Sequence, residues 1–136
     1  MTNSSLARSY LGKAEQRLKI LPILQDSGDY SDVIREAQEI VELCTKAMLR
    51  QAGIEPPKWH DVGGLILEHR EKFPQEAQAH LKRVAEISKW LRKERELAFY
   101  GDIDFVPSEQ YTEEDGRRAL KDAGFVYDIA RQVIPA

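Results

Sequence analysis

Residues 31–51, SDVIREAQEIVELCTKAMLRQ, carry the clearest periodic pattern in this chain of 136 residues. One stripe of apolar residues recurs at spacings of three and four, and further apolar residues widen it. The stripe consists of Val33, Ala37, Ile40, Cys44 and Ala47, and it is widened by Ile34, Val41 and Met48. A face this wide predicts a helix that is buried against two neighbours, because one neighbour covers only a narrow stripe.

Four further helices are expected around this one, separated by Gly and Pro. They run from about Ser4 or Ser5 to Gln25, over 62–73 after a cap at Asp61, from about Gln75 to Phe99, and from a capping box at Thr112 and Asp115 to about Val133. Pro22 predicts a kink or an early stop in the first of them, and DIDFVPSEQ (102–110) is expected to be an irregular loop. Strand signals are almost absent. We therefore predict an all-α fold, an up-and-down antiparallel helical bundle of about five helices, with residues 1–136 as a single domain.

Composition narrows the functional classes. The chain is 42% hydrophobic and 32% charged, with a net charge of -3, which is typical of a soluble globular protein and argues against bulk DNA binding. No apolar run reaches the length of a membrane span, and no signal peptide is visible, so we expect a cytoplasmic protein. The single cysteine, Cys44, is expected to be a small core residue. No cofactor and no metal site are predicted; Glu76 and His80 are four residues apart, but a third ligand is not evident.

The stretch RKERELAFYGDID, residues 92–104, places an arginine on the inward stripe of a predicted helix. That stripe consists of Leu81, Val84, Ser88, Leu91, Arg95 and Ala98. We therefore expect Arg95 to point toward the bundle core or toward a partner surface that continues it. A charge in such a place is costly unless it is paired. Two interpretations stay open: an ion pair with an acid such as Glu39 or Glu42, or an arginine held in a groove for phosphate.

Three stretches resemble the HEPN domain (higher eukaryotes and prokaryotes nucleotide-binding). They are SGDYSDVIREAQEIVELCTKAMLRQAGIEPPKWHDV at 27–62, RKERELAFYGD at 92–102 and YTEEDGRRALKDAGFVYDIA at 111–130. The resemblance covers nearly the whole chain and implies an up-and-down helical bundle. It also implies the family's activities: many members are metal-independent endoribonucleases that act as homodimers. Many prokaryotic members are toxins encoded with a minimal nucleotidyltransferase, which in one branch adenylylates a tyrosine two residues after the motif histidine.

The family's catalytic motif is an arginine followed, after four to six residues, by a histidine, and here that motif is incomplete. The resemblance places the motif arginine on Arg95 and the histidine position on Tyr100, or with longer gaps on Gly101 or Asp102. The tyrosine of the adenylylated branch also falls on Asp102. Tyrosine, with a pKa of about 10 in water, is a poor base at neutral pH compared with histidine.

Three hypotheses follow for the function. The first is a nucleotide- or RNA-associated module that forms a homodimer and pairs with a minimal nucleotidyltransferase in a toxin–antitoxin-like system, without cleavage activity. The second is a metal-independent endoribonuclease toxin that uses an atypical Arg95, Tyr100 and Asp102 site. The third is a purely structural bundle, which predicts that Arg95 is fully paired within one chain and that no open groove lies beside it.

Overall fold

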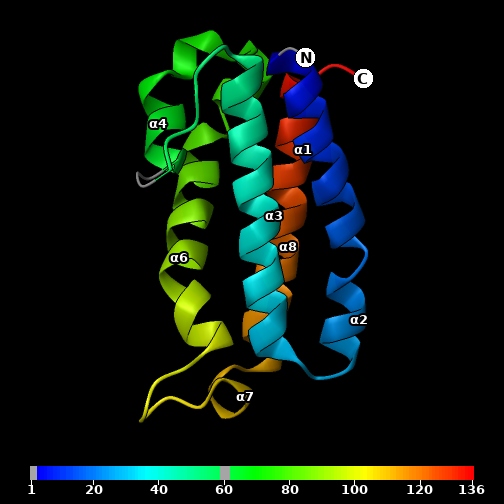
Figure 1. Ribbon diagram of the computed structural model, residues 1–136, viewed down its shortest axis with the longest axis vertical. Coiled ribbons are helices and arrows are strands. Elements are labelled where there is room, and N and C mark those ends of the chain that lie inside the picture. The colour runs from blue at the N-terminus through cyan, green and yellow to red at the C-terminus, as the bar shows by residue number, and fades with distance from the viewer. Residues whose placement is uncertain (1–2, 59–61) are drawn as a thin grey trace.

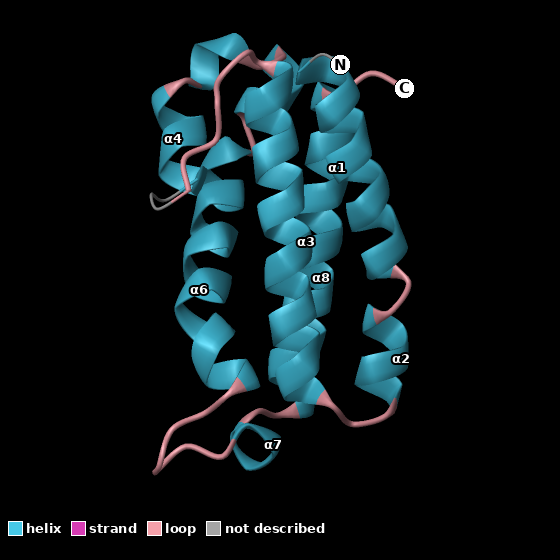
Figure 2. Cartoon of the chain, in the orientation of Figure 1, coloured by secondary structure: helices cyan, strands magenta, loops and turns pink. Residues whose placement is uncertain are grey.

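The computed structural model describes residues 3–58 and 62–136, and in these ranges the regular secondary structure is helical (Figure 2). The long helices are α1 (Asn3–Leu18), α3 (Tyr30–Gln51), α6 (Leu81–Phe99) and α8 (Glu113–Val133). The short ones are α2 (Leu21–Asp26), α4 (Val62–Glu68), α5 (Gln75–Gln78), α7 (Pro107–Gln110) and the 3₁₀ helix η1 (Arg70–Lys72). The all-α prediction is confirmed.

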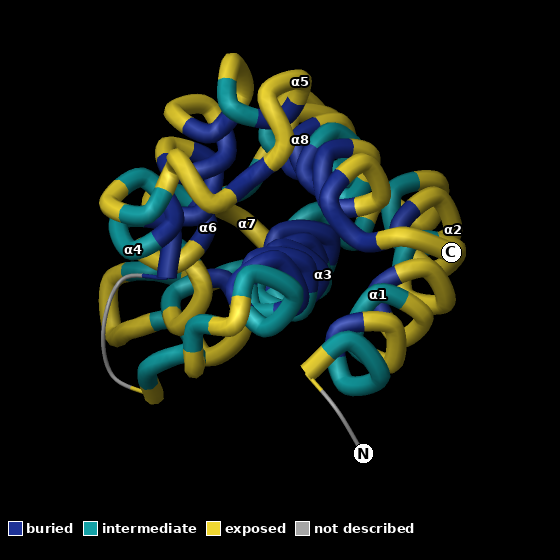
Figure 3. Tube along the Cα trace, turned by 90° about the horizontal axis from the view of Figure 1, so that it is seen from above, coloured by how far each residue is buried: buried dark blue, intermediate teal, exposed yellow. Residues whose placement is uncertain are grey.

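The long helices lie side by side and run alternately up and down, as the bundle prediction requires (Figure 1). The start of α1 and the end of α8 lie at one end of the bundle, and α2 and α7 lie at the other. Helix α3 occupies the middle, where it packs against α1, α6 and α8 and also touches α4. Viewed from above, α3 is dark blue along most of its length, which means that most of its residues are buried (Figure 3). The wide apolar stripe of 31–51 is therefore covered by more neighbours than the two we expected.

Two helix ends follow the local signals in the sequence. The first predicted helix stops early: α1 ends at Leu18, and Pro22 then lies in the first turn of α2, where its missing N–H is harmless. Helix α8 begins with the predicted capping box. The Thr112 hydroxyl accepts a hydrogen bond from the Asp115 N–H at 3.2 Å, and the Asp115 carboxylate accepts one from the Thr112 N–H at 2.9 Å.

Two segments that were each predicted to form one continuous helix are divided in the structure. The one over 75–99 is divided into α5 and α6, because α5 packs its buried Ala77 toward α8 while the Gln78 amide donates to the Phe73 carbonyl at 2.9 Å. These contacts hold α5 as a separate turn before α6 begins at Leu81. The helix over 62–73 likewise ends at Glu68 and continues as η1. The predicted cap at Asp61 lies outside the described residues.

The segment between α6 and α8 is more ordered than the predicted irregular loop. It contains α7, with Pro107 in its first turn, and an isolated antiparallel bridge in which Asp102 and Phe105 exchange backbone hydrogen bonds of 3.0 and 2.9 Å. Gly101 precedes the bridge with φ +73°, in the left-handed region that glycine adopts most readily. The chain therefore leaves α6 in a tight, defined turn.

No helix in residues 3–58 and 62–136 is both long and apolar enough to cross a membrane.

Candidate functional site: an arginine groove between α3 and α6

Three arginines line one open hollow of about 400 Å³ where α6 ends beside the first turns of α3. Arg35 comes from α3, and Arg92 and Arg95 come from α6, where a spacing of three places them on one helix face. Glu96 and Tyr100 complete the lining. We call these five residues the arginine groove.

A single carboxylate holds two of the arginines. Arg95 donates to Glu39 Oε1 at 2.9 Å, and Arg35 donates to the same oxygen at 2.7 Å. The Arg95 side chain is 44% exposed and that of Glu39 is 25% exposed. Ion pairs this open to water contribute little stability. The effect of Glu39 is therefore mainly to orient two guanidinium groups that together carry more charge than it neutralises.

Aromatic rings form the rim of the groove at the end of α6. The Arg35 guanidinium lies 4.7 Å from the centre of the Phe99 ring, and Phe99 meets Tyr100 edge to face at 4.8 Å. Tyr100 is 74% exposed. Proteins that bind single-stranded nucleic acids use this combination: the exposed ring stacks on a base, and the cationic side chains contact the phosphate backbone.

Arg95 does not point into the bundle core, which was one of the two directions expected; the other, toward a partner surface that continues the stripe, stays a prediction. The other five residues of its stripe are buried, but the long Arg95 side chain leaves the seam and carries its charged head to the surface beside Glu39. The predicted ion pair with Glu39 is present. The open hollow beside Arg95 contradicts the purely structural hypothesis, which required that no groove lie there.

Arg95 and Tyr100 share the groove, whereas Asp102 does not line it. The Asp102 carboxylate instead accepts a hydrogen bond of 2.7 Å from the Ile103 N–H, and its backbone forms the bridge to Phe105. Of the three predicted site residues, the fold therefore brings two together and uses the third in the turn.

A neighbouring hollow of about 490 Å³ shares Arg35 with the groove and contains a second pair of opposite charges. Arg17 donates to Glu36 at 2.7 Å, and this hydrogen bond with the charge of Glu36 raises the pKa of Arg17. Asp32 lines the same hollow, and its pKa is raised to about 6 by partial burial and then by the hydrogen bond and charge of Asp29.

The raised pKa of Asp32 predicts a pH-dependent contribution to stability. An unfolded aspartate titrates near pH 3.9, roughly two pH units lower, so between about pH 4 and about pH 6 the folded chain binds more protons. Its contribution is therefore greatest below about pH 4 and is lost as the pH rises through about 6. We expect Asp32→Asn to raise the free energy of unfolding at about pH 7.5 by about 1 kcal/mol or less, since water screens this carboxyl.

Urea unfolding of both proteins at about pH 4 and about pH 7.5 checks this expectation. The variant should gain stability relative to the natural chain only at the higher pH. An equal effect at both pH values would mean that the folded pKa of Asp32 is not raised.

Sequence reasoning missed Arg35, Arg92 and Phe99. Two spacings could have indicated the arginines: Arg35 precedes Glu39 by four residues, and Arg92 precedes Arg95 by three. Each pair lies on one face of its own helix, the first on α3 and the second on α6. Only the packing of α6 beside α3 shows that these two faces meet.

The other candidate chemistry is not supported by the structure. Cys44 is a core residue, as predicted, and burial raises the pKa of its thiol, so that it remains protonated and unreactive. Glu76 and His80 are exposed, and no group of three or more potential metal ligands is found in the described part of the chain.

A family model for the HEPN domain matches residues 7–133 of the sequence. The chain belongs to the HEPN domain family. This HEPN chain is also 23% identical, over 139 residues, to a protein of Methanocaldococcus jannaschii (strain ATCC 43067 / DSM 2661 / JAL-1 / JCM 10045 / NBRC 100440) that is named "Putative toxin". The similarity spans 97% of this chain and 90% of that relative. No solved structure gives a significant match. The resemblance inferred from the sequence is thus confirmed, and the arginine groove lies within the matched residues of a HEPN domain.

Proposed function

We propose that this HEPN chain binds RNA or a nucleotide in the arginine groove and does not cleave it. The observation that carries the proposal is the convergence of Arg35, Arg92 and Arg95 in one open hollow beside the exposed ring of Tyr100. Guanidinium groups match phosphate geometry, and an exposed ring accepts a base by stacking. Since Glu39 is shared between two arginines, N–H groups remain that a phosphate oxygen can accept from.

The absence of cleavage is argued from the chemistry of the reaction. RNA cleavage without a metal needs a base for the 2′-hydroxyl and an acid for the leaving oxygen, and each works best with a pKa near neutrality. The motif position for that group holds Tyr100, and Asp102 lies outside the groove.

One observation favours a second candidate function. Arg95 and Tyr100 do lie in the same hollow, as a metal-independent endoribonuclease would require. In that case Tyr100 would take the place of the histidine, with Asp102 reached by a change in the turn after α6. No cofactor is needed for either function.

The proposed biological role is that of a toxin-like module paired with a minimal nucleotidyltransferase in the cytoplasm, with residues 1–136 as one domain. A name that reads "Putative toxin" on a relative covering almost the whole chain supports this role. The described helices also share one continuous apolar core, which supports a single domain.

Binding and cleavage are tested together with a labelled single-stranded RNA in EDTA. We expect binding that weakens with salt, because phosphate contacts release counterions, and no cleavage. Arg95→Ala should weaken binding by about tenfold, the value of one charge-assisted hydrogen bond. Arg70→Ala removes one exposed arginine from outside the groove and should bind like the natural protein.

Two results would contradict the proposal. Cleavage that disappears in both Arg95→Ala and Tyr100→Phe would establish the endoribonuclease instead. Equal RNA affinity in Arg95→Ala and Arg70→Ala would remove the groove as the binding site.

We also propose a homodimer, formed at the end of the bundle where α6 ends. Three large apolar residues that do not line the groove are exposed along this short segment: Phe99, Ile103 and Val106, of which Ile103 is 92% exposed. Contiguous apolar surface of this kind commonly marks a protein interface. Light scattering at micromolar concentration should give twice the 15.6 kDa of one chain, and Ile103→Asp should shift the protein toward the monomer. A monomer in the natural protein would contradict the proposal.

A further inference from the structure

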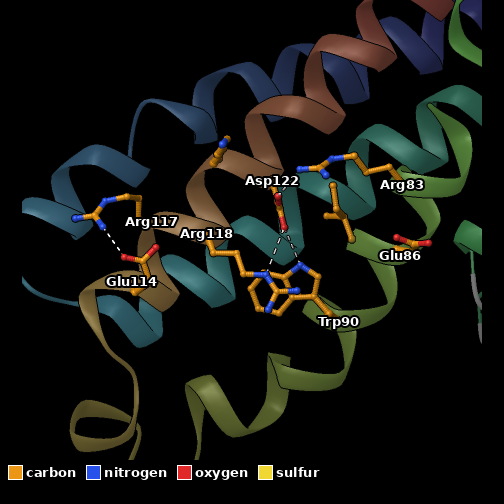
Figure 4. A pocket seen from close by; sticks show the side chains of 9 residues that line it. Arg83, Glu86, Trp90, Glu114, Arg117, Arg118 and Asp122 are labelled. Carbon is orange, nitrogen blue, oxygen red and sulfur yellow. Dashed lines mark hydrogen bonds and ion pairs between the residues drawn. The ribbon is translucent and has the colours of Figure 1, made fainter. Parts of the chain in front are cut away.

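A second hollow of about 400 Å³ lies between α6 and α8 and shares no lining residue with the arginine groove (Figure 4). Helix α6 contributes Arg83, Glu86 and Trp90, and α8 contributes Arg118, Lys121 and Asp122. We call the space that these residues line, together with Ile87, Glu114 and Arg117, the α6–α8 hollow.

A nearly buried carboxylate forms its floor. The Asp122 side chain is 9% exposed, and its shortest hydrogen bond comes from the neutral indole N–H of Trp90 at 2.9 Å. Two guanidinium groups share the same carboxylate at longer range, Arg83 at 3.5 Å and Arg118 at 3.9 Å. These distances lie at or beyond the limit of a good hydrogen bond. Asp122 therefore attracts both guanidinium groups only weakly, and among the described residues most of their N–H groups have no acceptor.

The two arginines are held in place by aromatic rings. Arg118 lies 4.1 Å from the centre of the Trp90 ring, and Arg83 lies 4.9 Å from the centre of the Phe125 ring. Figure 4 shows Arg118 lying across Trp90 while Arg83 reaches toward Asp122 from the other side. A stacked guanidinium keeps its N–H edge free for an anion in the plane of the fork. The arrangement is therefore preorganised to receive one.

The charges in the hollow do not balance. The lining contains four cationic side chains, those of Arg83, Arg117, Arg118 and Lys121, against three acids, Glu86, Glu114 and Asp122. Within the described chain, the side chains of Lys121 and Glu86 form no hydrogen bond or ion pair. Arg117, which also lines the hollow, is bound to Glu113 and Glu114 and turns away from Trp90 (Figure 4). The cationic side chains nearest Trp90 are thus the ones that still have N–H groups able to donate to an anion.

We propose that the α6–α8 hollow binds a small, multiply charged phosphate anion, which is either the polyphosphate of a nucleotide or free pyrophosphate. Three cationic groups favour an anion that carries more than one negative charge. A single carboxylate is already present in the hollow, that of Asp122. A small anion suits this hollow, because its cationic side chains are confined to one cluster around a space of about 400 Å³. Trp90 offers a ring on which a base could stack in exchange for Arg118.

The test uses the fluorescence of Trp90, which becomes the sole tryptophan in a Trp59→Phe background. Pyrophosphate and ATP are titrated separately in EDTA at low salt. We expect a saturable change in Trp90 fluorescence, with affinity lowered about tenfold by Lys121→Gln and by Arg118→Ala. Lys13→Gln, on the exposed surface of α1, and Arg95→Ala should leave it unchanged. The last variant separates this site from the arginine groove, so failure of either proposal can be recognised on its own.

The outcomes distinguish the two sources of phosphate. Equal affinity for pyrophosphate and ATP supports recognition of the phosphates alone, and tighter binding of ATP supports a nucleotide whose base stacks on Trp90. The proposal is overturned if neither ligand gives a saturable change while circular dichroism shows intact folding. It is equally overturned if Lys121→Gln and Arg118→Ala bind as well as Lys13→Gln, or if only a long RNA alters the fluorescence.

Discussion

Ile40→Ala is expected to lower the free energy of unfolding by about 2–5 kcal/mol, which is the range for truncating a large buried aliphatic side chain. Ile40 is fully buried on α3, the helix that packs against α1, α6 and α8 at once. A cavity there removes contacts with several helices and cannot be closed by the shift of one neighbour. Urea unfolding at constant pH measures the change.

The chain offers a matched control for this substitution. Ile23, on α2, is 65% exposed, so Ile23→Ala removes the same atoms from a surface position. We expect a change of about 0.5 kcal/mol or less. Similar losses in the two variants would mean that α3 is not the centre of the core.

Gly101→Ala is expected to lower the free energy of unfolding by about 2–5 kcal/mol. Two effects add: a left-handed φ of +73°, which costs alanine about 1–2 kcal/mol, and an overlap that costs about 1–3 kcal/mol. A Cβ atom at Gly101 would meet the Phe105 carbonyl oxygen and lie 2.6 Å from Pro107 Cδ. Since Tyr100 is the preceding residue, RNA binding in the arginine groove should weaken as well.

Gly53→Ala separates these two effects. Gly53 has φ +81°, but a Cβ atom there would have no neighbour within 4 Å. It should therefore show only the conformational part, about 1–2 kcal/mol. If Gly101→Ala costs no more than Gly53→Ala, the close approach of Phe105 and Pro107 to Gly101 does not persist in solution.

The parts of the fold that sequence analysis predicted well are those set by local chemistry. The burial of α3 follows from its wide apolar stripe, and the start of α8 follows from side chains three residues apart at Thr112 and Asp115. The division between α5 and α6 was missed, because it depends on the packing of Ala77 toward α8, which no local periodicity records.

The candidate site could be predicted only in part, for the same reason. The incomplete motif drew attention to Arg95 and Tyr100, which do share the groove. Arg95 does not point into the bundle core, because a heptad position fixes where the Cα atom lies, whereas the end of a long side chain follows its partner. That partner, Glu39, is 56 residues away in the sequence. Arg35 reaches the groove through the same non-local packing.

Because Arg35 and Arg95 share Glu39, the arginine groove contains an anion of its own that competes with any bound phosphate. The carboxylate occupies N–H groups that an incoming phosphate would need. A ligand must therefore exchange with an anion that is always present at high effective concentration, since α3 holds it beside the arginines. While no ligand is bound, Glu39 keeps the two guanidinium groups aligned. Because a phosphate must displace Glu39, its affinity is limited and it can leave readily.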